Sequence, residues 1–284
     1  MNFKNFSSKD IAQYYDVSED HYRYFWDLNQ SHALHYGYWD ESTKTFKEAL
    51  ANINQVLANE AGIQSGMHVL DAGCGIGGSS IWLAHHKSTT VTGITLSAKQ
   101  AARANNIAQK LDLNKMVSFQ VQDYMHTNFE SNTFDIVWAI ESICHADDKK
   151  KFVNEAFRLL KPGGTLIMAD FFIVKDATEK EQVELNKWAH GWAVPFFEKK
   201  NIFEKYLMES GFKKIAMIDA TTHIIKSAKR LYIAFFPGWF LSKVYNLLHK
   251  NTTEFSKKNV YTAYFQYKTL KKELWQYCIV KAVK

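Results

Sequence analysis

The sequence predicts one α/β domain built on a doubly wound, mostly parallel sheet of seven strands. Short apolar runs alternate with polar, helix-forming stretches from residue 68 onward, which is typical of strands buried on both faces. A glycine-rich turn follows the first of these runs, and sheets of this kind bind ligands at the carboxyl ends of their strands. At 284 residues the chain is short enough to share a single core.

Residues 1–62 are predicted to form a helical, aromatic cap on this core. Nine aromatic side chains fall within residues 9–39, more than a plain linker would carry. An amphipathic helix is predicted at residues 45–61. It ends at Gly62, because glycine readily adopts the left-handed conformation that closes a helix.

The central part of the chain alternates strands and helices. Polar helical stretches separate the apolar runs, so the runs are expected to pair in parallel. The predicted strands are residues 68–70, 90–94, 117–121, 134–139 and 165–172, and the predicted helices are residues 79–86, 98–111 and 149–160.

The regular alternation breaks after residue 172. A further helix is predicted at 202–210 and further strands at 214–219 and 277–283. We therefore assign residues 63–220 and 266–284 to the core. Residues 221–265 are helical and aromatic and too long for a simple connection, so they are predicted to form a lid inserted before the last strand.

Composition excludes several classes of protein. The net charge of +6 comes from lysines spread along the whole chain, which permits weak attraction to anionic partners without requiring nucleic acid, and we expect no nucleic-acid partner. The three cysteines, Cys74, Cys144 and Cys278, form no CxxC pair and are expected to be reduced. No apolar run is long enough to cross a membrane and residues 1–9 contain no secretory signal, so we expect a cytoplasmic protein.

Residues 69–79 (VLDAGCGIGGS) run from a strand through a glycine turn into a helix. Glycines let the backbone approach a ligand closely, and Gly73, Gly75 and Gly78 satisfy the dinucleotide pattern GxGxxG, so NAD is an alternative cofactor. Nucleotide-binding sites of this kind often have an acidic residue at the end of the second strand that binds the ribose hydroxyls. This sequence lacks it, since no Asp or Glu occurs between Ala72 and Leu111. Asp71 favours an amino-acid cofactor, because a carboxylate attracts an ammonium group and repels a pyrophosphate.

This turn, together with the segment 160–164 (LKPGG) before a further strand, resembles the class I methyltransferases that use S-adenosylmethionine (SAM), which have a Rossmann-like fold. The sequence is more specifically similar to the sterol C-methyltransferase and γ-tocopherol methyltransferase group. The similarity covers most of residues 10–220, returns at 267–281 and leaves the lid unmatched. It is carried by 93–100 (GITLSAKQ), 139–146 (AIESICHA), and Tyr14, Tyr15 and Asp16 with Tyr22 and Trp26 downstream.

The resemblance implies SAM as cofactor and a role for each motif residue. Asp71 would hold the α-ammonium, with Gly73 and Gly75 beside the methionine part. The other implied contacts are Thr95 and Gln100 to the ribose hydroxyls, Asp123 to the adenine amine and Tyr15 to the cofactor carboxylate. Thr95 as a strand end, Gln100 as a solvated helix residue and Asp123 as a turn former are the structural alternatives.

Glu141 and His145 are the candidate catalytic residues, because they follow the fourth strand at its carboxyl edge. Methylation of an alkene leaves a carbocation, which Glu141 can quench by accepting a proton. Methylation of a phenol needs one base, and His145 suits that task near neutral pH. The aromatic faces predicted to stabilise a cation are Tyr15, Tyr22, Trp26, Tyr38 and Trp192.

Other roles for these residues stay open. Glu141 can bond backbone amides, and His145 can cap the helix that begins near Asp147. The spacing of Glu141 and His145 also suits a metal, but no third ligand is evident, and we expect no metal. Cys144, which lies between them, is expected to be a buried thiol.

The lid contains eleven nearly unbroken apolar residues at 231–241, flanked by Lys226, Lys229, Arg230 and Lys243. This run is too short to span a bilayer. It can pack on the core, line a hydrophobic substrate site or touch a membrane surface. A further hypothesis is that a prenyl chain lies on its aromatic side chains while a diphosphate meets the basic ones.

The leading prediction is a SAM-dependent C-methyltransferase that acts on a hydrophobic isoprenoid alkene, sterol-like or linear prenyl, through a carbocation. The alternative is an O-methyltransferase of a phenolic, tocopherol-like small molecule. A non-catalytic SAM-binding protein is the third hypothesis, and the presence of Glu141, His145 and the aromatic cap argues against it.

Overall fold

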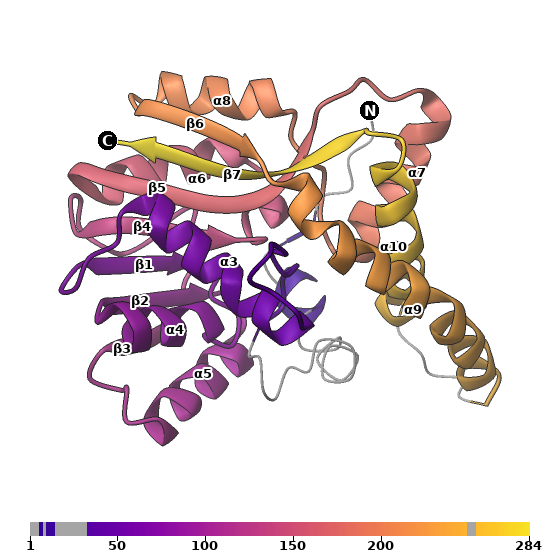
Figure 1. Cartoon of the computed structure of the whole chain (residues 1–284), viewed down its shortest axis with the longest axis horizontal. Helices are drawn as coiled ribbons and strands as arrows, with labels where there is room; N and C mark the ends of the chain where they lie inside the picture. Colours follow the sequence, from indigo (N-terminus) through magenta and orange to yellow (C-terminus); the bar gives the residue numbers. More distant parts are fainter. Residues whose placement is uncertain (1–5, 8–9, 15–32, 249–253) are drawn as a thin grey trace.

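The computed structural model describes residues 6–7, 10–14, 33–248 and 254–284, and its centre is a seven-stranded sheet in the order β3-β2-β1-β4-β5-β7-β6 (Figure 1). Strands β1 to β5 are parallel, whereas β7 is antiparallel to both of its neighbours. The prediction of a doubly wound, mostly parallel sheet is confirmed. The strands are β1 (His68–Ala72), β2 (Thr90–Thr95), β3 (Val117–Val121), β4 (Phe134–Ile140), β5 (Leu160–Ile173), β6 (Lys213–Asp219) and β7 (Trp275–Val283).

Helices cover both faces of the sheet, and side chains alternate between the two layers. Val69 lies in the core beneath α3 (Phe46–Ala61), α4 (Gly78–Lys87) and α5 (Ala98–Lys110). The next residue, Leu70, lies in the core beneath α6 (Lys149–Leu159) and α8 (Lys200–Glu209). This two-residue period places an apolar side chain on each face in turn, which explains the continuous apolar runs in the sequence.

The predicted helices begin and end at recognisable caps. At α3, the Thr45 side chain accepts from the Glu48 amide and the Glu48 side chain accepts from the Thr45 amide, while Gly62 closes the helix in the left-handed conformation. A second capping box, Thr178 with Glu181, starts α7 (Glu179–Gly191), a helix that the sequence analysis did not predict. Local signals of this kind explain why the sequence located the predicted helices to within a few residues.

One strand begins earlier than the sequence predicts. The predicted helix ended at residue 160 and the next predicted strand began at 165, but Leu160 already pairs with Phe134, and β5 runs from there to Ile173. The register between β4 and β5 shifts after this first pair, which accommodates Pro162 and the two glycines that follow it. Pro162 lacks an amide donor, so it is tolerated where the ladder is irregular.

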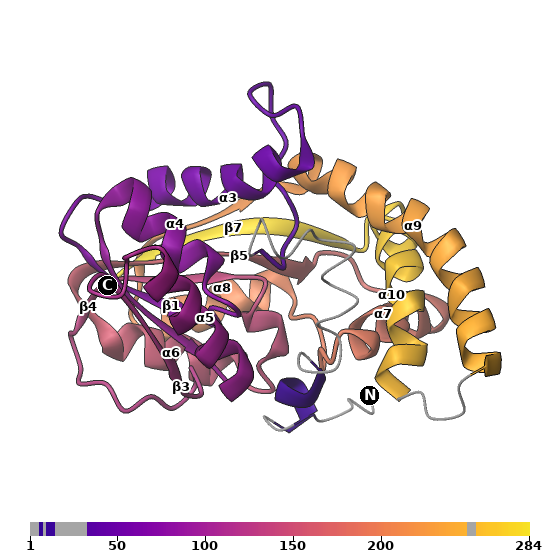
Figure 2. The ribbon, with the colours of Figure 1, turned by 90° about the horizontal axis from the view of Figure 1, so that it is seen from below.

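The inserted segment folds as two long helices, α9 (Thr221–Leu248) and α10 (Glu254–Leu270). They extend away from the end of the sheet in both views (Figure 2), and α10 packs against α7 and α9. The helical character of the segment is confirmed, and its second helix continues past residue 265. Within the described residues, no helix combines the length and apolar composition needed to cross a bilayer.

The strand order reverses direction beside β1, which pairs with β2 on one side and β4 on the other. The chain crosses from one face of the sheet to the other at this point, so the loops after β1 and β4 diverge. Such a switch point leaves a crevice at the carboxyl ends of the strands.

Candidate active site

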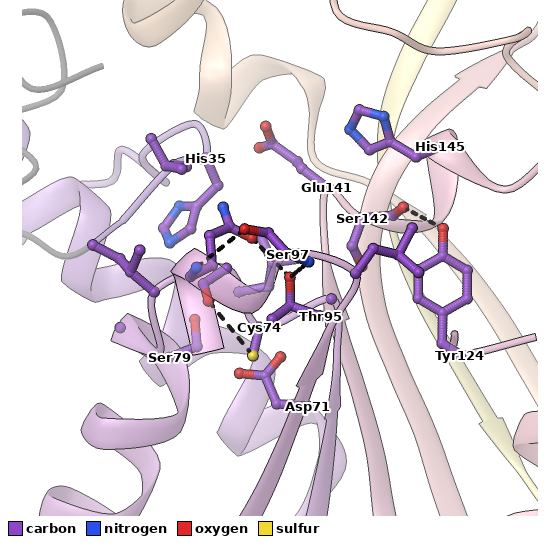
Figure 3. Close-up of a pocket in the computed structure, with 18 of the residues that line it drawn as sticks. His35, Asp71, Cys74, Ser79, Thr95, Ser97, Tyr124, Glu141, Ser142 and His145 are labelled. Carbon is purple, nitrogen blue, oxygen red and sulfur yellow. Dashed lines mark hydrogen bonds between the residues drawn. The ribbon is translucent and has the colours of Figure 1, made fainter. Parts of the chain in front are cut away.

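A cleft of about 840 Å³, partly open to solvent, lies at this switch point (Figure 3). Its walls come from the glycine turn after β1, the end of β2, the end of β4 and residues 11–12 and 33–35 of the cap. Seven of the predicted cofactor-binding and catalytic residues line it together: Asp71, Gly73, Gly75, Thr95, Gln100, Glu141 and His145.

The glycine turn brings the backbone against the loop after β4. Gly73 has φ +91°, and a Cβ at this position would lie 2.4 Å from Cβ of Ser142. Only glycine adopts this conformation and leaves the space. Ser142 is held in place because its hydroxyl donates to the Ala72 carbonyl at 2.6 Å and its own carbonyl accepts from Tyr124 Oη at 2.9 Å. The glycine therefore lets the turn pack directly against the loop after β4, beside the cleft.

Asp71 is a buried carboxylate at the floor of the cleft. Its Oδ2 accepts a hydrogen bond from the Ser80 hydroxyl at 2.6 Å. Burial raises the pKa of Asp71 to about 6, and the hydrogen bonds from Ser80 offset only part of this effect. A cationic ligand group beside Asp71 would stabilise its charged form, so the position suits an ammonium group.

Thr95 and Gln100 form a pair at the end of β2. Thr95 Oγ1 donates to the side-chain oxygen Oε1 of Gln100 at 2.7 Å. The backbone N–H of Gln100 donates to Oγ of Ser97, which is the N-cap residue of α5. Oε1 of Gln100 is therefore engaged by Thr95, and the side-chain nitrogen Nε2 lies beside Gly75. A Cβ on Gly75 would lie 4.0 Å from Gln100 Nε2. Thr95 and Gln100 thus lie at the end of β2, where an acidic residue often binds the ribose hydroxyls and where this sequence has none.

Glu141 follows β4 in an uncommon conformation, with φ +47°. Its Oε1 accepts two hydrogen bonds, from the Tyr36 amide at 2.7 Å and from Tyr277 Oη at 2.8 Å. Burial raises the pKa of Glu141 to about 8, and the nearby Asp170 charge adds to this, while both hydrogen bonds act in the opposite sense. Backbone strain at a non-glycine residue is common at functional sites.

The short 3-10 turn Ile143–His145 is held by two buried ionisable residues. Asp170 on β5 accepts from the Cys144 amide at 2.9 Å. Lys149 donates to the carbonyls of Cys144 and Ala146, and its ammonium lies 3.8 Å from the centre of the Phe196 ring. Burial raises the pKa of Asp170 to about 6 and lowers that of Lys149 to about 8. This network fixes the loop that carries His145.

His145 is buried, and its Nδ1 lies 3.3 Å from the Ala193 carbonyl. A carbonyl accepts only from a protonated nitrogen, so Nδ1 carries the proton and Nε2 is basic. Burial lowers the pKa of His145 to about 4, which keeps the ring neutral at physiological pH. The neutral form is the one that a general base requires.

His35 lines the same cleft and was not singled out by the sequence analysis. Its Nδ1 lies 2.9 Å from the Tyr36 carbonyl, whereas its buried Nε2 has no hydrogen-bond partner in the described structure. Burial lowers the pKa of His35 to about 4. Tyr277, which holds Glu141, was also missed. The dense aromatic run at 35–39 and the similarity of the tail at 267–281 were the available signals.

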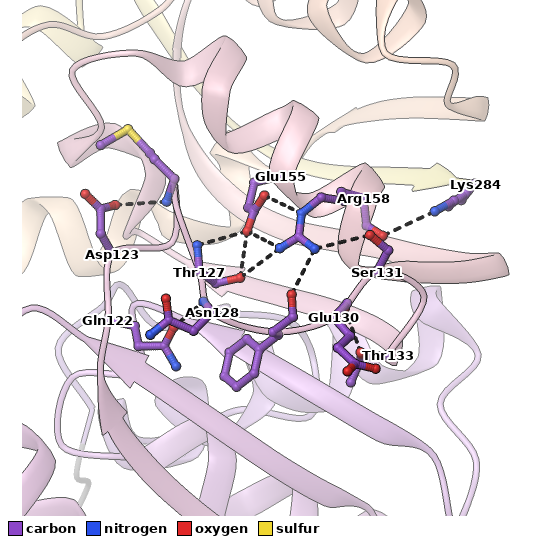
Figure 4. Close-up of polar contacts among 12 residues, drawn as sticks. Gln122, Asp123, Thr127, Asn128, Glu130, Ser131, Thr133, Glu155, Arg158 and Lys284 are labelled. Carbon is purple, nitrogen blue, oxygen red and sulfur yellow. Dashed lines mark hydrogen bonds and ion pairs between the residues drawn. The ribbon is translucent and has the colours of Figure 1, made fainter.

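Asp123 does not line the described cleft. Its side chain accepts from the Met125 amide at 2.9 Å, which is the turn-forming role. Hydrogen bonds hold the loop after Asp123 against α6 (Figure 4). Arg158 forms an ion pair with Glu155, which accepts from the Thr127 amide, and Arg158 also donates to the Phe129 carbonyl. The adenine contact of Asp123 stays a prediction.

The predicted aromatic faces are only partly described. Tyr15, Tyr22 and Trp26 lie outside the described residues. Tyr38 stacks on His223 with 4.2 Å between ring centres and does not line the cleft. Trp192 also lies outside the lining, and its ring packs against Tyr36 with 6.2 Å between ring centres.

Lys226, Lys229 and Arg230 of the lid do not line the cleft. Lys226 lies over the Trp39 ring and Arg230 over the Phe46 ring, at 5.0 and 4.1 Å from the ring centres. Among the described residues, no cluster of three or more His, Cys, Asp and Glu side chains is arranged to hold a metal.

Comparison with known proteins gives a family match over almost the whole chain. The family model described as mycolic acid cyclopropane synthetase matches residues 3–276. The 27-O-demethylrifamycin SV methyltransferase of Amycolatopsis mediterranei is 32% identical over 214 residues, which are 75% of this chain and 77% of that protein. The expectation of a methyltransferase is therefore confirmed.

Sterol and quinol methyltransferases are also similar. Sterol 24-C-methyltransferase ERG6 of Saccharomyces cerevisiae is 32% identical over 210 residues, 72% of this chain and 53% of that protein. The 2-methyl-6-phytyl-1,4-hydroquinone methyltransferase of Synechocystis sp. is 35% identical over 187 residues, 64% of this chain and 56% of that protein. The chain thus spans about half the length of these two relatives, and the predicted resemblance to this group is confirmed.

Solved structures share the fold at low sequence identity. The cyclopropane synthase MmaA2 from Mycobacterium tuberculosis has a TM-score of 0.81, 18% identity and full coverage of both chains. A geranyl diphosphate methyltransferase in complex with GPP and sinefungin has a TM-score of 0.76 and 19% identity, and covers 97% of this chain and 98% of that one. These likenesses support the predicted Rossmann-like methyltransferase architecture.

Proposed function

The chain belongs to the mycolic acid cyclopropane synthetase family of methyltransferases, and we propose that it methylates a carbon of a hydrophobic isoprenoid double bond. The methyl donor is SAM, as expected from the sequence. A substrate of this kind partitions into lipid, so the protein would meet it at or near a membrane surface.

The observation that carries the proposal is the buried Glu141 carboxyl group at the end of β4. A carboxylate can remove a proton from a carbocation that forms beside it, and a site with little water protects that cation from being trapped. Glu141 lines the cleft from the loop after β4, and burial raises its pKa to about 8. A carboxylate with a raised pKa is also a stronger base than one in water.

The residues present fit SAM in its expected place. Asp71 offers a buried carboxylate for the ammonium, Gly73 lets the turn pack closely against Ser142 beside the cleft, and the Thr95–Gln100 pair offers polar groups for a ribose. When bound, SAM supplies an electrophilic methyl group that adds to the alkene and leaves a positive charge on the neighbouring carbon. Its sulfonium charge also favours ionisation of Glu141.

Glu141 then accepts the proton whose loss quenches the cation. Tyr277 Oη and the Tyr36 amide hold Oε1 in one direction, so Oε2 is the oxygen available to the substrate. The position of the lost proton decides the product. Loss from the adjacent carbon leaves a methylated alkene, and loss from the transferred methyl closes a cyclopropane, the ring named in the family description.

Methylation of a phenol is the second candidate function. His145 is the candidate base for it, because the ring lines the cleft and is neutral, although its lowered pKa makes Nε2 a weaker base than that of a free histidine. An O-methyltransferase and a hydroquinone methyltransferase occur among the relatives. A protein that binds SAM without catalysis is the third candidate, and it predicts no turnover of any acceptor.

Turnover of deuterated-methyl SAM with geranyl diphosphate, a Δ24 sterol and a phytyl hydroquinone would separate these functions. We expect Glu141→Gln to abolish alkene turnover while S-adenosylhomocysteine still binds by calorimetry, because the amide oxygen can keep both hydrogen bonds. Glu204→Gln, at an exposed residue of α8, is the matched control. Mass spectrometry of the product distinguishes a methyl group with three deuterons from a cyclopropane with two.

Unchanged alkene turnover in Glu141→Gln would exclude this base. Turnover of the hydroquinone alone, lost in His145→Asn and kept in Glu141→Gln, would establish the phenol chemistry instead. Binding of S-adenosylhomocysteine without turnover of any acceptor class would favour the non-catalytic alternative.

A further inference from the structure

The outer face of the α9–α10 pair exposes an unusual number of large apolar side chains. Phe236 is 52% exposed, Trp239 40% and Tyr261 38%, and outside residues 240–260 no other described aromatic side chain is exposed to this degree. Ile225 and Ile233 on α9 are exposed as well. A soluble surface rarely gathers such residues on one element without a partner.

The large apolar residues of α9 that are described as exposed lie on one face of the helix. At 100° per residue, Ile225, Ile233, Phe236 and Trp239 fall within an arc of about 120°. Exposed Lys229 falls inside the same arc. Trp239 Nε1 lies 3.2 Å from Tyr261 Oη, so the stripe continues onto α10. We call these residues, Ile225, Lys229, Ile233, Phe236, Trp239 and Tyr261, the outer stripe.

The positive charge of the chain is concentrated in the same two helices. Residues 221–270 contain eight Lys and Arg residues and one acidic residue, Glu254. The other 234 residues contain 27 basic and 28 acidic residues. Lysines occur along the whole sequence, but basic residues outnumber acidic ones within residues 221–270 and not in the other 234 residues taken together. The net charge of +6 therefore arises from this one segment.

We propose that the outer stripe docks on an anionic lipid bilayer, with Phe236 and Trp239 entering the interfacial layer and Lys229 facing the headgroups. Tryptophan and tyrosine favour this layer because they pair an apolar ring with a polar group. Basic residues beside an apolar helix face strengthen binding to anionic lipid. The two helices extend beyond the sheet in Figures 1 and 2, so the stripe can reach a flat surface.

The charge pattern selects a membrane over a second copy of this chain. Two copies meeting through this face would bring two segments of net positive charge together, whereas an anionic surface neutralises them. The inference is independent of the proposed acceptor, because it concerns where the protein binds and not which atom it methylates.

Cosedimentation with phospholipid vesicles tests the proposal. The full chain is expected to bind vesicles of phosphatidylcholine mixed with phosphatidylglycerol, to bind phosphatidylcholine alone much more weakly, and to lose binding as salt is raised. The double variant Phe236→Ser/Trp239→Ser should lower the partition coefficient on the order of tenfold through lost apolar burial. Lys229→Glu should lower it by about tenfold or more.

Matched controls come from exposed residues elsewhere. Val183 and Met208 are 52% and 56% exposed on α7 and α8, so Val183→Ser/Met208→Ser removes similar apolar surface outside the stripe. Lys180→Glu reverses a charge on α7. Both controls should bind like the unmodified protein, and all variants should retain S-adenosylhomocysteine binding, which excludes misfolding.

Three results would overturn the proposal. The first is failure of the unmodified chain to bind anionic vesicles at low salt. The second is equal binding by the outer-stripe variants and the controls. The third is self-association that the outer-stripe variants abolish in sedimentation velocity, without any vesicle binding, which would assign the face to a second copy.

Discussion

Tyr277 Oη donates a hydrogen bond to Glu141 Oε1 at 2.8 Å, although the two residues are 136 positions apart in sequence. Tyr277 lies on β7, which enters the sheet antiparallel beside β5, and Glu141 follows β4 on the other side of β5. The bond stabilises the carboxylate form and so opposes the burial that raises the pKa of Glu141. Tyr277 is thus a positioning residue for the proposed base.

Tyr277→Phe should raise the pKa of Glu141 by about one unit, because one hydrogen bond to the charged form is worth roughly 1 to 1.5 kcal/mol. Since the base acts as a carboxylate, the rising limb of kcat/KM against pH should move to higher pH by that amount. The pH profile of methyl transfer measures it. An unshifted profile would remove Glu141 as the titrating base, and Tyr206→Phe, at a half-buried tyrosine on α8, serves as control.

Asp71→Asn should weaken S-adenosylhomocysteine binding by about 30-fold or more, because loss of one partner of a buried charged pair typically costs at least about 2 kcal/mol. In the unmodified protein, affinity should fall as the pH drops through about 6, where Asp71 protonates in the unliganded protein. Ser80→Ala removes a hydrogen bond that lowers this pKa and should move the midpoint to higher pH. Calorimetry between pH 5 and 8 checks both, and pH-independent affinity would contradict the ammonium site.

Gly73→Ala should destabilise the protein by about 2 kcal/mol or more, since it combines an unfavourable positive φ with a clash against Ser142. Gly163→Ala is the matched control, because Gly163 also has a positive φ, +80°, but a Cβ there meets nothing within 4 Å. This control should cost only about 1 kcal/mol. Urea unfolding gives both values, and equal costs would show that Ser142 simply moves aside.

His35→Asn should reduce the loss of stability in acid. Burial lowers the pKa of His35 from 6.5 to about 4 in the folded protein, so the folded state binds this proton less tightly than the unfolded state does. The corresponding stability is fully present above pH 6.5 and is lost as the pH falls toward 4, by about 3 kcal/mol in all. Urea unfolding at pH 7.5 and 4.5 measures it. Exposed His86→Asn should change nothing, and an equal acid response in His35→Asn would refute the effect.

Local sequence determined most of the fold and half of the site. Capping residues and apolar runs mark the helices and strands, because these signals act over a few residues. Asp71, Gly73 and Gly75 were predicted together since one strand, one turn and one helix carry them. Thr95 and Gln100 were predicted for the same reason, as they are five positions apart and bond directly.

Tertiary structure alone decided how Glu141 is held and which groups share its cleft. The Tyr36 amide and Tyr277 Oη reach it from positions 105 and 136 residues away, and His35 reaches the cleft from the cap. No local pattern encodes such pairings, because they depend on the chain folding back over the sheet. The raised pKa of Glu141 and the lowered pKa of His35 follow from burial in that assembled core, so the sequence names the residue types and the packing sets their protonation.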